Sequence, residues 1–300
     1  MTRTPSAMPI LVALTGLACF SVMDGVMKAA STAIGPYGAM FWRNLLGALF
    51  MAPIWLNARR RAGLRGLPGV DVLKLHLLRS AVAGTMAVLF FYGVVRTPLA
   101  ESIALSFLAP LIALYLAAVM LGEQVGPRAV AGSVLALGGV GVIAAGKFGG
   151  HYEPEAIKGL AAILVSAVLY AWNLVLQRRQ AQVAGPEEIA FFQTFLIFVL
   201  LGAGAWWWAG TPTPVVWGEL AVSAVLSTGS LMLLGWAYAR EEAKVLVPLE
   251  YTAFVWAAMV GWVGFGEALT WRTLAGVVLI VAGCLIASRQ EPAPRIAEPA

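Results

Sequence analysis

Residues 119–139 read VMLGEQVGPRAVAGSVLALGG, and residues 263–283 read VGFGEALTWRTLAGVVLIVAG. A shift of 144 positions lays the second segment on the first, and the two then share a Gly-Glu pair, a later arginine and an Ala-Gly pair. The chain therefore contains an internal repeat, which indicates two copies of one structural unit. The matched positions are Val119 and Val263, Gly122-Glu123 and Gly266-Glu267, Arg128 and Arg272, Ala131-Gly132 and Ala275-Gly276, and Gly139 and Gly283, with Arg96 and Arg240 upstream.

A weaker match at an offset of 150 carries the repeat toward the N-terminus. We therefore expect residues 1–147 to form the first repeat and residues 148–290 the second, followed by a cytoplasmic tail at residues 291–300. The upstream matches are Gly35-Pro36 with Gly185-Pro186, and Phe41 with Phe191.

The composition is that of a membrane protein. Of the 300 residues, 60% are hydrophobic and only 12% are charged, and the mean hydropathy is +0.84. A water-soluble domain of this size cannot bury so much apolar surface. The apolar residues also come in blocks, and about 20 apolar residues in an α-helix cross roughly 30 Å of hydrocarbon.

Ten such blocks predict an all-α integral membrane protein with ten transmembrane helices. The longest polar connection, Asn57 to Lys74, is too short to hold a folded catalytic or ATP-binding domain. Energy for any transport must then come from a gradient or a partner. The expected spans cover residues 9–30, 37–56, 75–95, 98–121, 128–146, 158–177, 187–208, 220–239, 244–264 and 272–288.

The number of spans sets the relation between the two halves. Each half holds five spans, an odd number, so the second half must enter the membrane in the opposite sense from the first. Inverted repeats of this kind place a solute site near the bilayer midplane and open it to each side in turn. The architecture therefore predicts a transporter.

The basic residues lie in the loops and form no single stripe, which argues against a nucleic-acid partner. Thirteen Lys and Arg residues fall on one side of the predicted spans and five on the other. Basic loops favour the cytoplasm, so we expect both termini there, in a multi-pass protein of the bacterial inner membrane. Trp206, Trp207, Trp208 and Trp217 then lie at the outer water interface, where indole rings are stable.

A resemblance to a phosphate-binding loop fails on its context. Gly141 to Lys147 spells G-x-x-x-x-G-K, but Phe148 follows in place of Ser or Thr and no strand precedes it. The segment also ends a helix, where the helix dipole repels phosphate. We expect no nucleotide cofactor.

The residues needed for enzyme chemistry are scarce. A membrane-embedded lipid enzyme needs a cluster of His, Asp or Cys to bind a metal or to act as a nucleophile with its base. Only His76 and His151 are present, and Cys19 and Cys284 both lie inside apolar segments. We expect no metal, no disulfide and no enzyme activity.

The residues also carry a resemblance to a known family. The run PLAESIALSFLAPL at residues 98–111, followed by Gly122-Glu123 and a Gly-rich span, resembles the EamA domain of the drug/metabolite transporter superfamily. Residues 244–283 resemble its second copy, so the likeness covers essentially the whole chain. It implies a carrier of small metabolites, often amino acids and their relatives, with a central cavity between the halves. The chain looks most similar to the family's bacterial amino-acid exporters.

Charged residues inside spans are informative, because each costs about 2.5 to 3.5 kcal/mol at mid-membrane. Asp24 and Lys28 are four residues apart on one face of the first helix and can neutralise each other. They form either a buried structural pair or a pair that lines the cavity. Arg43 and Arg79 lie near span ends, where a long side chain can extend to water, which favours a structural role.

Glu250 is the most unusual of these charges, because its short side chain cannot reach water from the ninth span. Pro248 leaves the carbonyl of Lys244 without its usual helical donor and tends to kink the chain. Irregular backbone at membrane depth is tolerated mainly where it lines protein or water. We expect Glu250 to face the cavity, and an ion pair with Arg79 is the alternative.

Polar and aromatic residues also recur within the fourth, the sixth and the ninth spans. Such hydroxyl and amide groups can join helices by hydrogen bonds, or they can form a polar cavity with aromatic walls. The complete set of candidate cavity residues is Asp24, Lys28, Ser102, Ser106, Tyr170, Asn173, Glu250, Tyr251 and Trp256.

Two further pairs of repeated residues have structural interpretations. Gly132 and Gly139, mirrored by Gly276 and Gly283, are spaced seven residues apart on one helical face, which indicates close helix packing. The glutamate of each Gly-Glu pair precedes an arginine by five residues, so we expect each pair to bridge two helix ends at the surface. The pairs are Glu123 with Arg128 and Glu267 with Arg272.

Together these patterns predict a secondary transporter that exports amino acids or related small metabolites by alternating access. Import of a vitamin such as riboflavin, or of a nucleoside-like cofactor, is the alternative within transport. A lipid enzyme is a weaker one. The expected partners are a small-molecule substrate and the lipid bilayer, with the oligomeric state left open, a monomer included.

Overall fold

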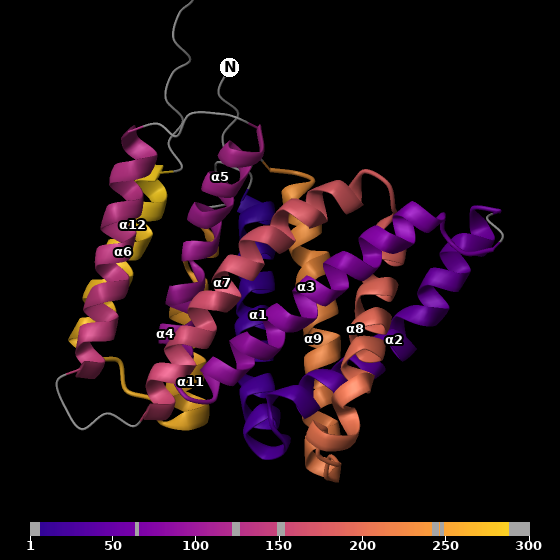
Figure 1. Cartoon of the computed structure of the whole chain (residues 1–300), viewed down its shortest axis with the longest axis horizontal. Helices are drawn as coiled ribbons and strands as arrows, with labels where there is room; N and C mark the ends of the chain where they lie inside the picture. Colours follow the sequence, from indigo (N-terminus) through magenta and orange to yellow (C-terminus); the bar gives the residue numbers. More distant parts are fainter. Residues whose placement is uncertain are drawn as a thin grey trace, which may run out of the picture.

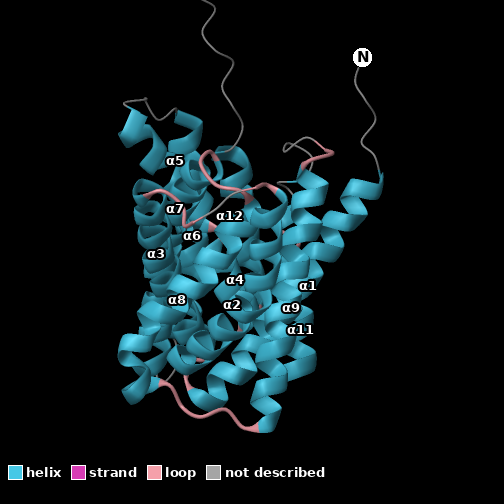
Figure 2. Cartoon of the chain, turned by 90° about the vertical axis from the view of Figure 1, so that its right-hand side faces the viewer, coloured by secondary structure: helices cyan, strands magenta, loops and turns pink. Residues whose placement is uncertain are grey.

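The computed structural model describes residues 7–63, 66–121, 127–148, 154–241, 246 and 249–287. Every regular element in this part of the chain is an α-helix, and Figure 2 accordingly draws helices joined by loops. The predicted fold class is confirmed. The C-terminal tail and His151 lie outside the described residues.

Among the described residues, six helices are named from the first half and five from the second. Several begin with proline at the first helical position, where the missing N–H costs nothing and the fixed backbone angle suits a helix. The first six are α1 (Ala7–Ile34), α2 (Pro36–Arg61), α3 (Val70–Val94), α4 (Leu99–Ser106), α5 (Leu108–Leu121) and α6 (Pro127–Phe148). The others are α7 (Pro154–Ala181), α8 (Pro186–Trp208), α9 (Pro214–Tyr238), α11 (Ala253–Phe265) and α12 (Trp271–Ala287).

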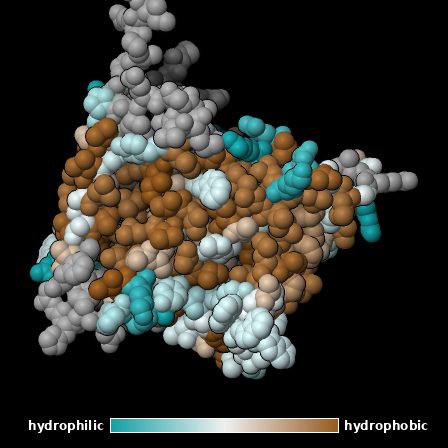
Figure 3. Space-filling model, viewed as in Figure 1, coloured by the Kyte–Doolittle hydropathy of each residue, from teal (hydrophilic) through white to brown (hydrophobic). Residues whose placement is uncertain are grey.

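These helices fit a membrane. Six of them, α1, α2, α3, α7, α8 and α9, are long and apolar enough to cross a bilayer, and the remaining predicted spans hold shorter apolar helices. Figure 3 shows hydrophobic residues across the middle of the visible face, with hydrophilic residues gathered at its margins. The ten predicted membrane segments therefore correspond to helices, with the fourth divided into α4 and α5.

Helix packing follows the repeat. The contact of α1 with α9 has its counterpart in the contact of α3 with α7, while α2 packs on α8 and α6 packs on α12. Figure 1 shows α6 beside α12 at one edge of the bundle. Since α2 and α8 are repeat equivalents, as are α6 and α12, both pairs lie across the axis that relates the halves. The apolar core fills the space among α1, α2, α3, α4 and α11, with Met27, Leu99 and Ala257 fully buried.

Glycines let α6 and α12 approach closely. A Cβ atom on Gly139 would lie 2.5 Å from the carbonyl oxygen of Gly276, and a Cβ on Gly283 would collide with the carbonyl oxygen of Gly132. The predicted packing role is confirmed. Gly139 meets Gly276 while Gly132 meets Gly283, so the two equivalent helices run antiparallel and the second repeat is inverted.

Each repeat also contains a break. Phe107 separates α4 from α5, and Pro110 explains this break because its missing N–H and its ring oppose a continuous helix through Ser106. In the second repeat Tyr251 and Thr252 form a turn immediately before α11. Since Phe107 and Tyr251 are 144 residues apart, the breaks occupy equivalent positions.

Candidate functional site

Three of the candidate residues come together from three different elements. The carboxylates of Asp24 on α1 and Glu250 before α11 both interact electrostatically with the hydroxyl of Tyr170 on α7. Glu250 also accepts a hydrogen bond from the hydroxyl of Tyr238, the last residue of α9. Tyr170 keeps 38% of its surface accessible, and Glu250 is exposed. Tyr170 thus combines accessible surface with the influence of two carboxylates from other elements.

Asp24 has an unusual environment for a carboxylate. Only 4% of its surface is exposed, and no hydrogen bond or salt bridge to it occurs among the described residues. Although its oxygens have no hydrogen-bond partner in this part of the chain, they are not sealed from solvent. The carboxylate therefore borders an accessible space. The charge that attracts it is the guanidinium of Arg43 on α2.

Arg43 was missing from the predicted site. The sequence suggested that its guanidinium extends to water at a span end, but the side chain is half-buried and interacts electrostatically with Asp24. Its hydrogen-bond partner is the thioether sulfur of Met40, 3.9 Å from Nη1. Because α1 and α2 pack together, the two charges belong to neighbouring helices.

Lys28 does not pair with Asp24, and that prediction was wrong. Its ammonium forms a salt bridge with Glu267, donates a hydrogen bond of 2.8 Å to the carbonyl of Thr97 and lies 5.2 Å from the ring centroid of Phe265. Only about 7% of its side chain is exposed. Lys28 thus links α1 to the end of α11, and so joins the two repeats.

The expected surface bridge between Glu267 and Arg272 is also wrong. Gly266 ends α11 in the left-handed conformation, with φ of 65°, and this turn directs Glu267 inward. Its second carboxylate oxygen accepts a hydrogen bond of 2.7 Å from the backbone N–H of Leu99 at the start of α4, where the helix dipole attracts negative charge. The equivalent Glu123 lies outside the described residues.

The two serines of α4 are occupied by local hydrogen bonds. The hydroxyl of Ser102 lies 2.7 Å from that of Thr97 and 3.1 Å from the carbonyl of Pro98. Ser106 donates to the carbonyl of Ser102 at 3.0 Å. These local bonds occupy the hydroxyl groups of both serines.

Asn173, one turn beyond Tyr170 on α7, contacts Arg79. The Arg79 Nε donates to the Asn173 side-chain oxygen at 3.2 Å, and Nη1 donates to the side-chain oxygen of Gln180. The alternative ion pair between Arg79 and Glu250 is therefore wrong. The guanidinium is instead satisfied by two neutral amides of α7, the helix that packs on α3.

Gln180 continues this polar network to His76. Since its oxygen faces Arg79, which can only donate, its amide nitrogen faces His76 Nδ1. Nδ1 must then accept, so the imidazole proton is on Nε2, 3.4 Å from Glu188. Glu188 also pairs with Arg59 at 3.0 Å. No sequence pattern indicates this chain of contacts, because its members come from four helices.

The last two candidates lie near the break in the second repeat. The ring of Tyr251 packs on that of Phe107, with centroids 5.1 Å apart and planes at 88°. Trp256 on α11 is half-buried, and its indole N–H is sealed from solvent without a hydrogen-bond partner among the described residues. An unpaired buried donor costs about 1 to 3 kcal/mol.

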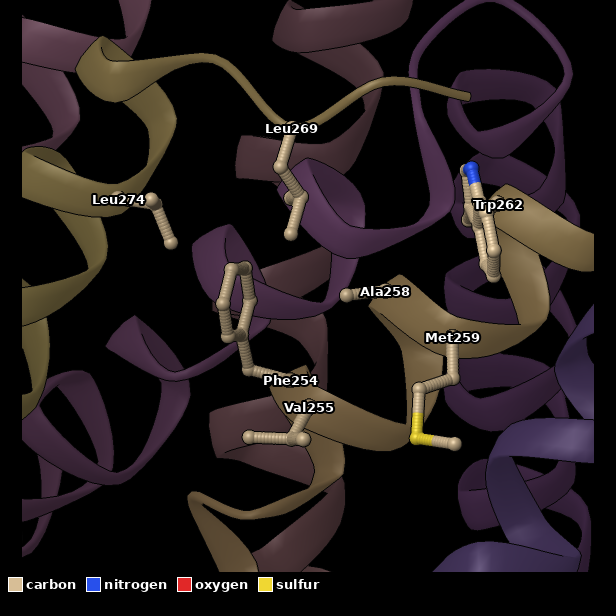
Figure 4. A pocket seen from close by; sticks show the side chains of 7 residues that line it. All are labelled: Phe254, Val255, Ala258, Met259, Trp262, Leu269 and Leu274. Carbon is tan, nitrogen blue, oxygen red and sulfur yellow. The ribbon is translucent and has the colours of Figure 1, made fainter. Parts of the chain in front are cut away.

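A separate pocket on α11 does not suit a polar solute. It has a volume of about 370 Å³, and Figure 4 shows its walls formed by α11, the following loop and α12. A charged group there would lose its hydration without gaining a partner. Within the described residues, no group of three or more His, Cys, Asp or Glu side chains could hold a metal ion. The pocket is lined by Phe254, Val255, Ala258, Met259, Trp262, Leu269 and Leu274.

Inverted repeats with broken helices are an architecture typical of membrane transporters. The EamA-like transporter family matches residues 7–145 and 157–289. The chain therefore belongs to the EamA-like transporter family and contains two EamA domains.

Relatives within the family carry different solutes. The chain is 30% identical over 285 residues to the pseudopaline exporter CntI of Pseudomonas aeruginosa strain PAO1, covering 93% of this chain and 95% of the relative. It is 26% identical over 286 residues to the riboflavin transporter of Rhizobium johnstonii, covering 93% and 89%. The aromatic amino acid exporter YddG of Salmonella typhimurium is 27% identical over 240 residues, covering 79% of each chain. The expected likeness to amino-acid exporters such as YddG is thus real, but CntI matches more of the chain.

The fold is also found among solved crystal structures, as one example shows. It superposes with a TM-score of 0.61 at 20% identity and covers 93% of this chain and 96% of its own.

Proposed function

We propose that this protein is a secondary carrier that exports amino acids or related small metabolites from the bacterial cytoplasm by alternating access. The observation that carries the proposal is the group formed by Asp24, Arg43, Tyr170 and Glu250, in which opposite charges border an accessible interior. In the proposed orientation both termini are cytoplasmic.

A zwitterion is the kind of solute that such a group can accept. Moving a charged group out of water is costly unless fixed partners replace its hydration shell. The guanidinium of Arg43 can receive a carboxylate, and the carboxylates of Asp24 and Glu250 can receive an ammonium group. Tyr170 supplies an aromatic wall and a hydroxyl. The pattern of fixed charges thus complements an amino acid.

Alternating access is supported by the inverted halves and by their contacts. The Lys28 and Glu267 salt bridge joins the repeats near the end of the bundle where α1 terminates. Breaks at Phe107 and Tyr251 divide one helix of each repeat near its middle, and discontinuous helices commonly form the midplane site of such carriers. Rocking of one repeat on the other would expose the site to each side in turn.

The direction and the solute are supported by named relatives. CntI and YddG are exporters, one of pseudopaline and one of aromatic amino acids. The riboflavin transporter among the relatives makes riboflavin uptake the competing assignment.

Counterflow with purified protein in liposomes tests the proposal. Vesicles loaded with an unlabelled amino acid should accumulate the labelled form from outside, without nucleotide, while protein-free vesicles should not. Several neutral amino acids should compete, since an apolar wall discriminates by only about 1 to 3 kcal/mol per methylene. Exchange of riboflavin or a nucleoside with no exchange of any amino acid would overturn the proposal.

A further inference from the structure

Arg43 is a half-buried cation whose hydrogen-bonding capacity is largely unused. A guanidinium carries five N–H donors and no acceptor. Its hydrogen bond among the described residues goes to a thioether sulfur, a weak acceptor, at 3.9 Å. By comparison, Arg79 donates to two amide oxygens and Lys28 to a carboxylate and a carbonyl. Arg43 therefore retains its capacity to bind an anion.

Asp24 does not use up that capacity. The two charges attract each other, yet no hydrogen bond or salt bridge joins them in the described structure, and the Asp24 carboxylate borders accessible space. Two opposite charges that are not bonded to each other provide a site for a ligand with both charges. A directly bonded pair would instead have neutralised itself.

The positions of Arg43 and Asp24 along their helices match the length of a small ligand. Arg43 is seven residues from Pro36, the start of α2, and Asp24 is ten residues from Ile34, where α1 ends at the same side of the bundle. At about 1.5 Å per residue these positions differ by only about 5 Å along the helix axes. The ammonium and carboxylate of an α-amino acid can therefore reach both. Glu250, beyond Tyr170, offers a second carboxylate for the ammonium group or for a further cationic group of a longer solute.

We propose that Arg43 binds the carboxylate of the substrate. The carrier then selects solutes that have a free carboxylate beside an ammonium group. This inference rests on the proposed function and adds the residue that determines the substrate class. The ligand class is then α-amino acids and longer amino-carboxylates. Carboxamides, esters and decarboxylated amines of the same side chain bind poorly.

The test compares each acid with its neutral analogue. Counterflow of labelled phenylalanine, methionine and lysine is measured in wild-type liposomes with the unlabelled amino acid or its carboxamide as competitor. Loss of one charge-assisted contact predicts that the carboxamide competes about tenfold to a hundredfold less well. In Arg43→Gln this preference should fall to about threefold or less, whereas Arg43→Lys should keep part of it.

The matched control is Lys74→Gln, since Lys74 is an exposed cation with 73% of its side chain accessible. This control should retain the wild-type preference. If Arg43→Gln keeps the wild-type preference, the inference fails although the carrier exchanges amino acids. If Arg43→Gln does not fold, Arg43→Lys decides, because an unchanged preference there excludes bidentate recognition by arginine. Failure of wild-type protein to exchange any of the three amino acids would instead count against the proposed function.

Discussion

The rings of Phe107 and Tyr251 meet edge to face, 5.1 Å apart, at the point where both repeats interrupt a helix. The two residues are equivalent under the 144-residue repeat. A contact between equivalent residues must lie at the axis that relates the halves. The two breaks therefore meet between the repeats.

The first prediction concerns this ring pair. An edge-to-face aromatic contact contributes about 0.5 to 1.5 kcal/mol beyond the area it buries. Phe107→Leu and Tyr251→Leu should each lower the free energy of unfolding, and the double variant should lose less than the sum by about that amount. Denaturant unfolding in detergent measures the free energy of unfolding of the wild type, the two single variants and the double variant. Strict additivity would show that the rings do not interact.

The second prediction concerns Lys28 and Glu267. Removing either charge leaves the other buried without its partner, so Lys28→Met or Glu267→Gln should lower the free energy of unfolding by about 3 to 5 kcal/mol. The double variant should recover much of this loss, because it leaves no single charge. The exposed pair Lys74 and Asp71 is the control, with side chains 73% and 96% accessible, and its loss should cost at most about 1 kcal/mol. Equal effects at both pairs would contradict the buried link.

The fold could be predicted from the sequence because its signals are long and repeated. Twenty-residue apolar blocks and the Gly-Glu motif are both read directly along the chain. The interruption at Phe107 was missed, since hydropathy is continuous across it. The turn after Gly266 was missed as well, because the destination of Glu267 depends on α1 and α4, which are distant in sequence.

The site was only partly predictable for the same reason. Asp24, Tyr170 and Glu250 were identified because charged and polar residues are rare inside spans, and the structure places them together. Arg43 was assigned to a span end, because a sequence gives depth without showing which neighbour attracts the side chain. Lys28 was matched to Asp24 by helical spacing, although Glu267 from the other repeat is its partner.

The third prediction uses two glycines with opposite surroundings. A Cβ on Gly276 would lie 2.5 Å from Ile143 Cγ1 and 2.7 Å from the Gly139 carbonyl oxygen, whereas a Cβ on Gly138 meets nothing within 4 Å. Gly276→Ala should therefore separate α6 from α12 and cost about 1 to 3 kcal/mol. Gly138→Ala should be neutral or stabilise by up to about 1 kcal/mol through helix propensity. Thermal unfolding of both variants checks this, and equal midpoints would contradict it.

The fourth prediction is topological. In a Cys19→Ala, Cys284→Ala background, Trp207→Cys should react with a membrane-impermeant thiol reagent in intact cells, because Trp207 is 72% exposed at the predicted outer side. Arg61→Cys should react only after the cells are opened, since the basic loop is predicted to be cytoplasmic. Labelling of position 61 from outside would reverse the orientation and, with it, the direction proposed for export.

The last prediction concerns Glu250, which accepts a hydrogen bond from Tyr238 and pairs with no cation among the described residues. Glu250→Gln therefore strands no buried charge, and the free energy of unfolding should change by less than about 1 kcal/mol. Transport should nonetheless fall strongly, because an amide cannot neutralise an ammonium group that has left water. Tyr238→Phe is the matched control, since it removes the hydrogen bond but keeps the carboxylate, and it should retain most transport. Both variants are measured for unfolding and counterflow on one purified preparation. Wild-type transport by Glu250→Gln would remove Glu250 from the site, and a loss of several kcal/mol in stability would show that it has a structural cation partner.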